Sequence, residues 1–184
     1  MMLTIILLLL AVTVSGCIGQ SVPVHNLLYN FTKDGVEYEF STNVYDAIKI
    51  SIYGKEDIYS RLVLTDRVLI IYGNNSADAP YIATASAELA SKLVHYYAYS
   101  QGRLVSISGM DLDSYAQNET ARNMSATLVE YRGPNTGANG TYVRLEGDRI
   151  VVEALNGTEM KSVSDRLMLV LFEDDLRAMG IGLP

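Results

Sequence analysis

The chain has 184 residues, of which 21 are acidic and 14 are basic, so its formal net charge is −7. This length fits one domain with a sizeable core, and the acidic excess argues against a nucleic-acid surface, which needs clustered basic residues. A single cysteine, Cys17, excludes an internal disulfide, a zinc site built of thiolates and an iron–sulfur cluster. The charges are unevenly distributed, because the first charged side chain along the chain is Lys33.

The uncharged N-terminal stretch carries the first informative pattern. Residues 3–14 form an apolar block that is shorter than the roughly 20 residues needed to cross a bilayer, and it has the length of a signal-peptide core. It leads into Val14, Ser15, Gly16 and Cys17. These four residues resemble the lipobox of secreted lipoproteins, in which an aliphatic residue and two small residues precede a cysteine. The resemblance implies cleavage before Cys17 and lipidation of its thiol.

We therefore expect three regions along the chain. Residues 1–16 form a signal peptide, residues 17–30 a short tether, and residues 31–184 a single folded domain. An uncleaved helical anchor over residues 1–18 is one alternative, and a buried core helix is another. A lipid or a helical anchor makes the membrane a partner and places the domain at the cell surface, on the outer face of the cytoplasmic membrane.

The second pattern is Asn-X-Ser/Thr, the acceptor sequence for asparagine-linked glycans on exposed loops of secreted proteins. It occurs at Asn30, Asn74, Asn118, Asn123, Asn139 and Asn156. Loops are rich in the same residue types, so ordinary turns are the alternative interpretation. In combination with the lipobox-like sequence, the pattern resembles archaeal cell-surface lipoproteins, which implies a glycoprotein.

The folded region is expected to begin with short elements. Alternation of apolar and polar side chains predicts a half-buried strand over residues 36–40. One helical turn is expected over residues 43–49, a short strand over residues 50–53, and a helix over residues 55–64.

The clearest unit is a strand, a helix and a second strand. Residues 68–72 are a continuous aliphatic and β-branched run, which is typical of a strand buried on both faces. A long helix follows over residues 80–100, with Pro80 near its start and Gly102 after its end. Residues 104–108 indicate a second buried strand, and this order implies a right-handed crossover and a parallel pair.

The C-terminal half begins with a polar stretch over residues 111–126, which predicts a loop or a weak helix. Residues 127–131 indicate a third strand. Residues 140–146 and 149–154 alternate around a Gly-Asp turn, which predicts an antiparallel hairpin.

Residues 158–179 predict a terminal helix, although the apolar run over residues 167–172 is also compatible with a buried strand. Together the elements predict an α/β fold with a mixed sheet in two or three layers. Its centre is a parallel strand–helix–strand unit, and an antiparallel hairpin and a terminal helix follow toward the C-terminus.

Sites in open α/β sheets gather at the carboxyl ends of the parallel strands, and two polar segments are expected there. Asp111 and Asp113 place two carboxylates just after a strand, where they can hold a hard cation. The loop over residues 132–141 offers backbone amides for an anion, with Arg132 adding charge, but it has no Walker-type sequence. A solvated acidic turn and a structural loop are the simpler interpretations. The candidate ligand edge consists of Asp111, Asp113, Arg132 and Thr136.

The two histidines, His25 and His95, lie far apart in the sequence and indicate neither a metal site nor a Ser–His–Asp arrangement. We therefore expect no cofactor, no metal and no nucleic acid. The favoured function is a non-catalytic, membrane-tethered binding or assembly domain of an envelope lipoprotein, with an envelope protein complex as its partner.

The alternative function is an extracellular hydrolase or transferase that uses Asp111, Asp113 and the loop over residues 132–141. Geometry separates the two functions. Convergence of Asp111, Asp113 and Arg132 in one concave pocket favours the enzyme, whereas separate, solvent-facing positions favour the binding domain.

Overall fold

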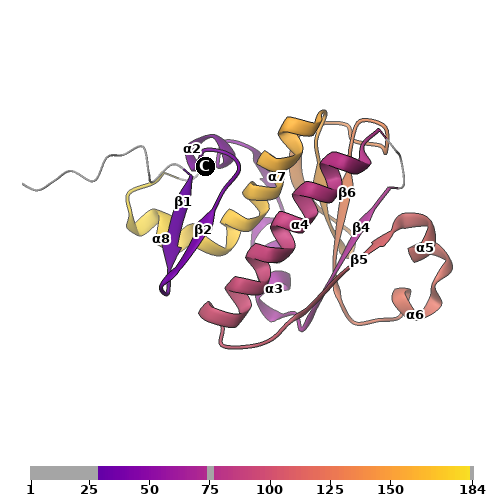
Figure 1. Cartoon of the computed structure of the whole chain (residues 1–184), viewed down its shortest axis with the longest axis horizontal. Helices are drawn as coiled ribbons and strands as arrows, with labels where there is room; N and C mark the ends of the chain where they lie inside the picture. The colour runs from indigo at the N-terminus through magenta and orange to yellow at the C-terminus, as the bar shows by residue number, and fades with distance from the viewer. Residues whose placement is uncertain (1–28, 74–76, 183–184) are drawn as a thin grey trace, which may run out of the picture.

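The computed structural model describes residues 29–73 and 77–182. It has an α/β fold with a six-stranded mixed sheet and a separate two-stranded hairpin (Figure 1). The predicted signal peptide, Cys17, His25 and the acceptor Asn74 lie outside the described residues. Within the described ranges, no helix combines the length and the apolar character needed to cross a membrane.

The described chain begins with a hairpin that the sequence predicted only in part. β1 (Asn30–Lys33) pairs antiparallel with β2 (Val36–Glu39) across a turn in which both Asp34 and Gly35 have left-handed backbone angles. β2 matches the predicted strand, whereas β1 was not predicted and begins inside the expected tether. Its inward side chain is Phe31, whose ring lies 4.9 Å from the ring of Phe172. One buried aromatic in four residues gives too little alternation to identify a strand from sequence.

The main sheet has the strand order β3-β7-β8-β6-β4-β5. The strands β8, β6, β4 and β5 are mutually parallel, while β3 and β7 run in the opposite direction. Their bounds are β3 (Ser51–Tyr53), β4 (Arg67–Tyr72), β5 (Ser106–Asp111), β6 (Thr127–Arg132), β7 (Tyr142–Glu146) and β8 (Arg149–Glu153). The predicted parallel centre and antiparallel hairpin are both confirmed.

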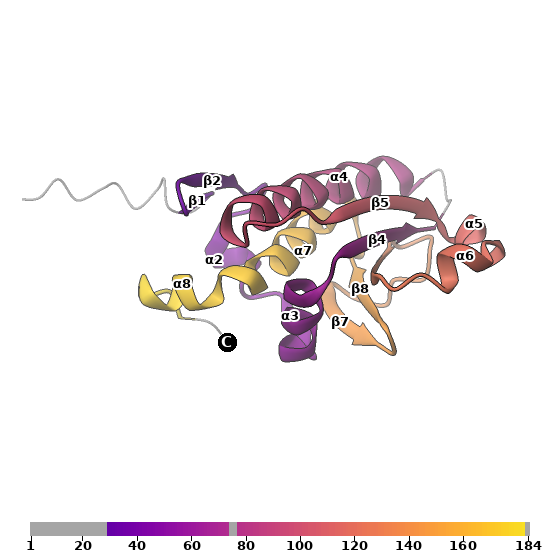
Figure 2. The same ribbon diagram turned by 90° about the horizontal axis from the view of Figure 1, so that it is seen from below.

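A layer of helices covers one face of this sheet, and α4 and α7 are its longest members (Figures 1 and 2). On the opposite face, α5 and α6 pack over one end of the sheet. The helices are α2 (Val44–Ala47), α3 (Lys55–Leu64), α4 (Ala79–His95), α5 (Leu112–Gln117), α6 (Glu119–Arg122), α7 (Gly157–Leu169) and α8 (Glu173–Ala178). The fold class is therefore α/β, as predicted.

The long helix was predicted over residues 80–100, and its last turn differs from the rest. α4 buries a stripe of apolar residues and then widens into a π-helical turn, η2 (Tyr96–Ser100). Tyr96 and Tyr97 are adjacent in sequence and both buried, which the wider turn permits. The hydroxyl of Tyr97 donates a hydrogen bond of 2.7 Å to the carbonyl of Leu62 and ties this turn to α3.

The prediction that the second strand is buried was wrong, whereas the predicted terminal helix is confirmed over its alternative, a buried strand at residues 167–172. The second strand, predicted over residues 104–108, is β5, which begins two residues later and lies at the edge of the sheet. Leu104 precedes it and is 92% exposed. The apolar run over residues 167–172 is helical: α7 continues through a 3₁₀ turn, η3 (Val170–Phe172), before α8 begins.

Candidate functional site

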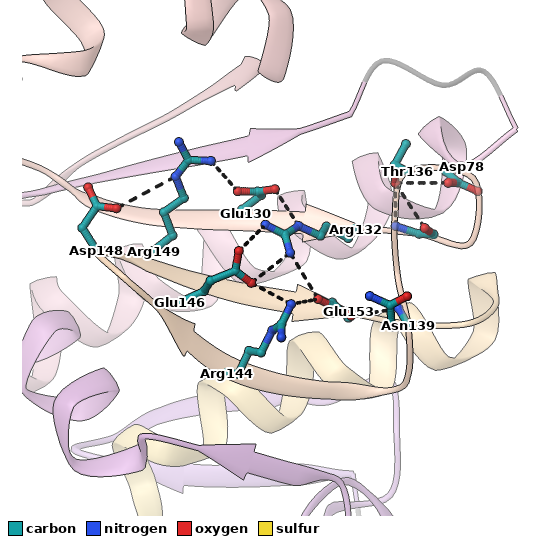
Figure 3. A network of polar contacts seen from close by, with 11 residues as sticks. Asp78, Glu130, Arg132, Thr136, Asn139, Arg144, Glu146, Asp148, Arg149 and Glu153 are labelled. Atoms are coloured by element: carbon teal, nitrogen blue, oxygen red, sulfur yellow. Dashed lines mark hydrogen bonds and ion pairs between the residues drawn. The ribbon is translucent and has the colours of Figure 1, made fainter.

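Three neighbouring strands of the sheet carry charged side chains on the face that α4 and α7 do not cover. Successive residues of a strand point to opposite faces, so every second residue of β6, β8 and β7 lies on this side. Six of them are charged and form one network (Figure 3). This charged cluster consists of Glu130, Arg132, Arg144, Glu146, Arg149 and Glu153.

Arg132, at the end of β6, is the centre of the cluster. Its Nε lies 2.7 Å from Glu130, and its two terminal nitrogens lie 3.1 and 3.2 Å from the two carboxylate oxygens of Glu146. A further contact of 3.4 Å reaches Glu153. Burial lowers the pKa of Arg132, but the hydrogen bonds to Glu130 and Glu146 outweigh it, so the net shift is upward. The guanidinium is therefore a permanent cation with a fixed orientation.

The other two arginines close the network. Nη2 of Arg144 donates a hydrogen bond to Glu153 at 2.8 Å and forms an ion pair with Glu146 at 2.6 Å. Arg149 donates to Glu130 at 2.8 Å. Glu153 has no exposed surface, and its second oxygen accepts the backbone N–H of Asn139 at 3.0 Å. Each buried carboxylate thus has at least two donors, as buried charges require.

Two carboxylates of the cluster, Glu130 and Glu146, have lowered pKa values. Burial raises the pKa of Glu130, but hydrogen bonds from Arg132 and Arg149 outweigh it and the net shift is downward. The pKa of the more exposed Glu146 is lowered mainly by its hydrogen bond with Arg132. Carboxylates held in this way are poor proton donors and are already occupied by guanidinium groups. Among the described residues, no group of histidines, cysteines and carboxylates is arranged to hold a metal ion.

Most of the charged cluster faces solvent, and within the described ranges only the guanidinium of Arg149 lies over a helix residue, 5.5 Å from the ring centroid of Tyr115 in α5. The described helices on this side, α5 and α6, pack over neighbouring positions through Leu69, Ile71 and Leu128. The side chains of Arg132, Arg144 and Arg149 are 18, 31 and 33% exposed. Val151 lies among them and is fully buried, because the long arginine side chains extend over it.

Two tyrosines extend this surface across β7 and β3. The rings of Tyr53 and Tyr142 meet edge to face, with their centroids 5.8 Å apart. The guanidinium of Arg144 lies over the ring of Tyr142 at 5.5 Å, and Tyr53 is 58% exposed. We name this surface the Arg–Tyr face, and it consists of Tyr53, Arg132, Tyr142, Arg144 and Arg149.

The glycine-rich loop over residues 132–141 uses its amides within the protein. Asp78, buried at the start of α4, accepts hydrogen bonds from the backbone N–H of Asn135 at 2.9 Å and from its side-chain amide at 2.8 Å. The hydroxyl of Thr136 donates to the same carboxylate at 3.2 Å and accepts from Gly133 N–H at 2.7 Å. With Asn139 bound to the cluster, the loop is a structural connection, which agrees with the simpler interpretation.

The other candidate residues do not join Arg132. The carboxylate of Asp111 accepts the backbone N–H of Ser114 at 2.8 Å and caps α5, and Asp113 lies exposed in the first turn of that helix. The hydrogen bond with Ser114 lowers the pKa of Asp111. Strand β4 lies between β5, which ends in Asp111, and β6, which ends in Arg132. Asp111, Asp113 and Arg132 therefore do not converge in one pocket, which is the arrangement that would favour an enzyme.

A cavity of about 240 Å³ does lie at the carboxyl ends of β4, β6 and β8. Its apolar wall is formed by Tyr81, Pro134, Leu155 and Met160, and its polar wall includes the already bonded Asp78. Among the described residues that line it there is no histidine, serine or cysteine. His95 lies elsewhere, exposed on α4 with its ring 6.1 Å from that of Tyr99.

Of the five described asparagines that the sequence predicts as glycan acceptors, four are exposed: Asn118, Asn123, Asn139 and Asn156. Asn118 and Asn156 cap α6 and α7 by accepting backbone N–H groups through Oδ1. A glycan is attached to Nδ2 and leaves that oxygen free to cap. Asn30 differs, because it is half-buried and its Nδ2 donates to Glu37 at 2.6 Å.

Sequence reasoning selected Arg132 but missed the five charged residues around it. Charges at every second position of the three predicted strands were the available signal, since such spacing puts them on one face. No protein-family model, curated protein or solved structure matches this chain. The assignment of a function therefore rests on the sequence patterns and on this geometry.

Proposed function

We propose that this chain is a membrane-tethered, extracellular domain that binds a partner protein during assembly of an envelope complex. The observation that carries the proposal is the Arg–Tyr face, an uncovered part of the sheet that displays three arginines and two tyrosines. Arginine and tyrosine are enriched at the centres of protein–protein interfaces, where their truncation weakens binding most.

The geometry of these arginines suits binding. Each is held by carboxylates of the charged cluster, at distances of 2.6–3.4 Å. A side chain that is already ordered loses less conformational entropy when a partner binds. Three arginines face three glutamates, so the cluster is locally neutral. A partner is therefore recognised by hydrogen bonding and stacking, and not by a strong opposite charge.

The tether and the glycans complete the proposal. The lipobox-like sequence ends at Cys17, 13 residues before β1. The hairpin of β1 and β2, where the described chain begins, lies at the opposite end of the domain from α5 and α6 (Figures 1 and 2). Asn118 and Asn123 flank α6, so glycans on them project at the end remote from the tether. This arrangement leaves the membrane-proximal side free of those two glycans.

The enzyme alternative receives no comparable support. Asp111 caps a helix, Thr136 binds Asp78, and Arg132 is enclosed by three carboxylates. An acid, a base or a nucleophile must reach a substrate within hydrogen-bonding distance. Asp111 and Thr136 are instead bound to other residues of the chain, and Arg132, a permanent cation, is neither an acid, a base nor a nucleophile.

Chemical crosslinking in native membranes tests the binding function. We expect the full chain to crosslink to one defined protein, and Tyr53→Ser to reduce the yield about tenfold. Tyr99→Ser is the matched control, because Tyr53 and Tyr99 are 58 and 63% exposed on different parts of the surface. Equal yields for the two variants, or recovery of an uncrosslinked chain alone, contradict the proposal.

The anchor and the glycans have separate tests. Cys17→Ser should release the domain into the medium or leave an uncleaved precursor, as detected by membrane fractionation and intact mass. Unchanged fractionation and mass contradict lipidation. The mass of the native protein should also fall on deglycosylation. Thr158→Ala, which removes the acceptor sequence at Asn156 but keeps the capping side chain, should remove one glycan.

A further inference from the structure

The edge strand β5 is unusually unprotected. None of the described strands pairs with its outer side, and the stretch over residues 104–110 contains no charged residue and no proline. Ser106, Ser108 and Gly109 are exposed, and Leu104 just before the strand is 92% exposed. Proteins usually protect such an edge with lysine, proline or a bulge, or by keeping the strand short. The opposite edge, β3, follows that rule with only three residues.

The backbone of β5 has an available set of donors and acceptors. The N–H of Ser106 donates to the carbonyl of Asp66, on the β4 side. Because the polar groups of successive strand residues point to alternate sides, those of Ile107 and Gly109 in β5 point outward. Both residues therefore present an N–H and a C=O to any strand that approaches, and Val105, just before β5, follows the same alternation if the pairing extends the strand.

We propose that β5 pairs antiparallel with β5 of a second copy of this chain, around a twofold axis at Ile107. In this register Ile107 faces its own counterpart as a hydrogen-bonded pair, and Val105 faces Gly109. Ile107 and Gly109 point their backbone groups outward, as the antiparallel ladder requires, and the pairing extends β5 by Val105. The contact continues the six-stranded sheet into the second copy and is self-complementary, as a twofold interface must be.

The side chains favour a second copy as the occupant of this edge. The register places Leu104 opposite Met110, which covers the most exposed large apolar side chain of the described chain. It places the small residues Ser106 and Ser108 opposite each other. The charged residues that bound the stretch are bonded within their own chain, Arg103 to Asp66 and the carbonyl of Thr65, and Asp111 to the backbone N–H of Ser114. No like charges meet across the pair.

This inference goes beyond the proposed function and does not rest on it, since the Arg–Tyr face belongs to β3, β7, β8 and β6. A pairing of about seven residues is a small interface, so we expect a weak dimer in solution. Attachment to a membrane confines the copies and raises their effective concentration, which strengthens a weak contact. Self-association and binding of a partner then occur on different parts of the sheet.

Two double variants of the same two serines test the register. Ser106→Lys with Ser108→Lys places lysine opposite lysine at two positions, whereas Ser106→Lys with Ser108→Glu places lysine opposite glutamate at both. Dimer dissociation constants are measured on the full chain in detergent by analytical ultracentrifugation over a concentration series. We expect the Lys/Lys variant to dimerise about tenfold more weakly than the wild type, and the Lys/Glu variant at least as tightly.

The controls keep the result decisive. Thermal unfolding of both variants checks that β5 still pairs with β4. A wild-type chain that stays monomeric at every concentration overturns the proposal, and so does a dimer that is equally strong in both variants. Tyr53→Ser should leave the dissociation constant unchanged. A chain that dimerises but crosslinks to no partner contradicts the proposed function alone. A chain that crosslinks to a partner but stays monomeric contradicts the dimer alone.

Discussion

The two faces of the main sheet are formed by alternate residues of the same strands, but their side chains are shielded from solvent in different ways. Toward α4 and α7, Val129, Ile150 and Val152 are fully buried in an apolar core. Their sequence neighbours Glu130 and Glu153 point to the other face and are also buried, although no helix layer covers them. The comparison shows that arginine side chains, paired with carboxylates, can replace a layer of helices over a strand.

The two faces also treat charge differently. One ion pair on the helix-covered side joins Lys92 of α4 to Asp165 of α7 at 2.6 Å, and the second oxygen of Asp165 accepts the backbone N–H of Thr42. Burial raises the pKa of Asp165, and the attraction of Lys92 does not fully offset it. In the charged cluster, by contrast, the pKa of Glu130 is lowered because two arginines donate to it. A carboxylate with two guanidinium partners is thus a more favourable anion than one with a single ammonium partner.

The largest effect is expected on the helix-covered face. Phe172 is fully buried, and its ring lies 4.7 Å from that of Tyr38 and 5.8 Å from that of Tyr96. Phe172→Ala should lower the free energy of unfolding by about 3–5 kcal/mol, because it leaves a cavity among these rings. Denaturant unfolding measures the loss. A change similar to that of the exposed control Tyr99→Ala would contradict this account of the core.

The second-largest effect tests whether the charged cluster stabilises the fold to an extent comparable with the apolar core. Glu153→Gln removes a fully buried anion that Arg132 and Arg144 share, and should cost about 3 kcal/mol because it leaves their charges poorly compensated. Glu146→Gln is the matched control in the same cluster. Its side chain is 47% exposed, so the cost should stay below about 1 kcal/mol. Equal costs would show that the cluster behaves as an ordinary solvated surface.

A fall in pH should change the free energy of unfolding in opposite directions through the two faces. Each change should be smaller than the effect of replacing Glu153. The lowered pKa of Glu130 means that the unfolded chain takes up its proton first, so stability is lost as pH falls from the ordinary value of 4.5 through the folded pKa. Asp165 behaves in the reverse way. Its raised pKa lets the folded protein take up the proton first, so its contribution to stability rises as pH falls toward 3.8.

Unfolding free energies measured across the acid range separate these contributions. Glu130→Gln should make the loss of stability at low pH shallower, and Asp165→Asn should make it steeper. Changes of the same sign in the two variants would contradict the assigned pKa directions.

The sequence predicted individual helices and strands better than it predicted the order of the strands in the sheet. Residues 55–64 and the strands of the hairpin were recognised because apolar spacing and a Gly-Asp turn act within a few residues. The position of β5 at the sheet edge depends on strand order, which spacing along one strand does not encode. Arg132 was selected for a site with Asp111, but β4 separates their strands. Its true partners come from β6, β7 and β8, and only the assembled order brings them together.

The smallest loss of stability is expected at Asp78, which connects the helix layer to the loop beside the charged cluster. It lies at the start of α4, in the helix layer, and binds Asn135 and Thr136 in the loop that follows the charged strand β6. Asp78→Asn exchanges one acceptor oxygen for a donor and should cost about 1–2 kcal/mol. Hydrogen exchange should quicken at Asn135 N–H more than at Asn139 N–H, because Glu153 still accepts the latter. Equal acceleration at both amides would instead show that the loop and the charged cluster open as one unit.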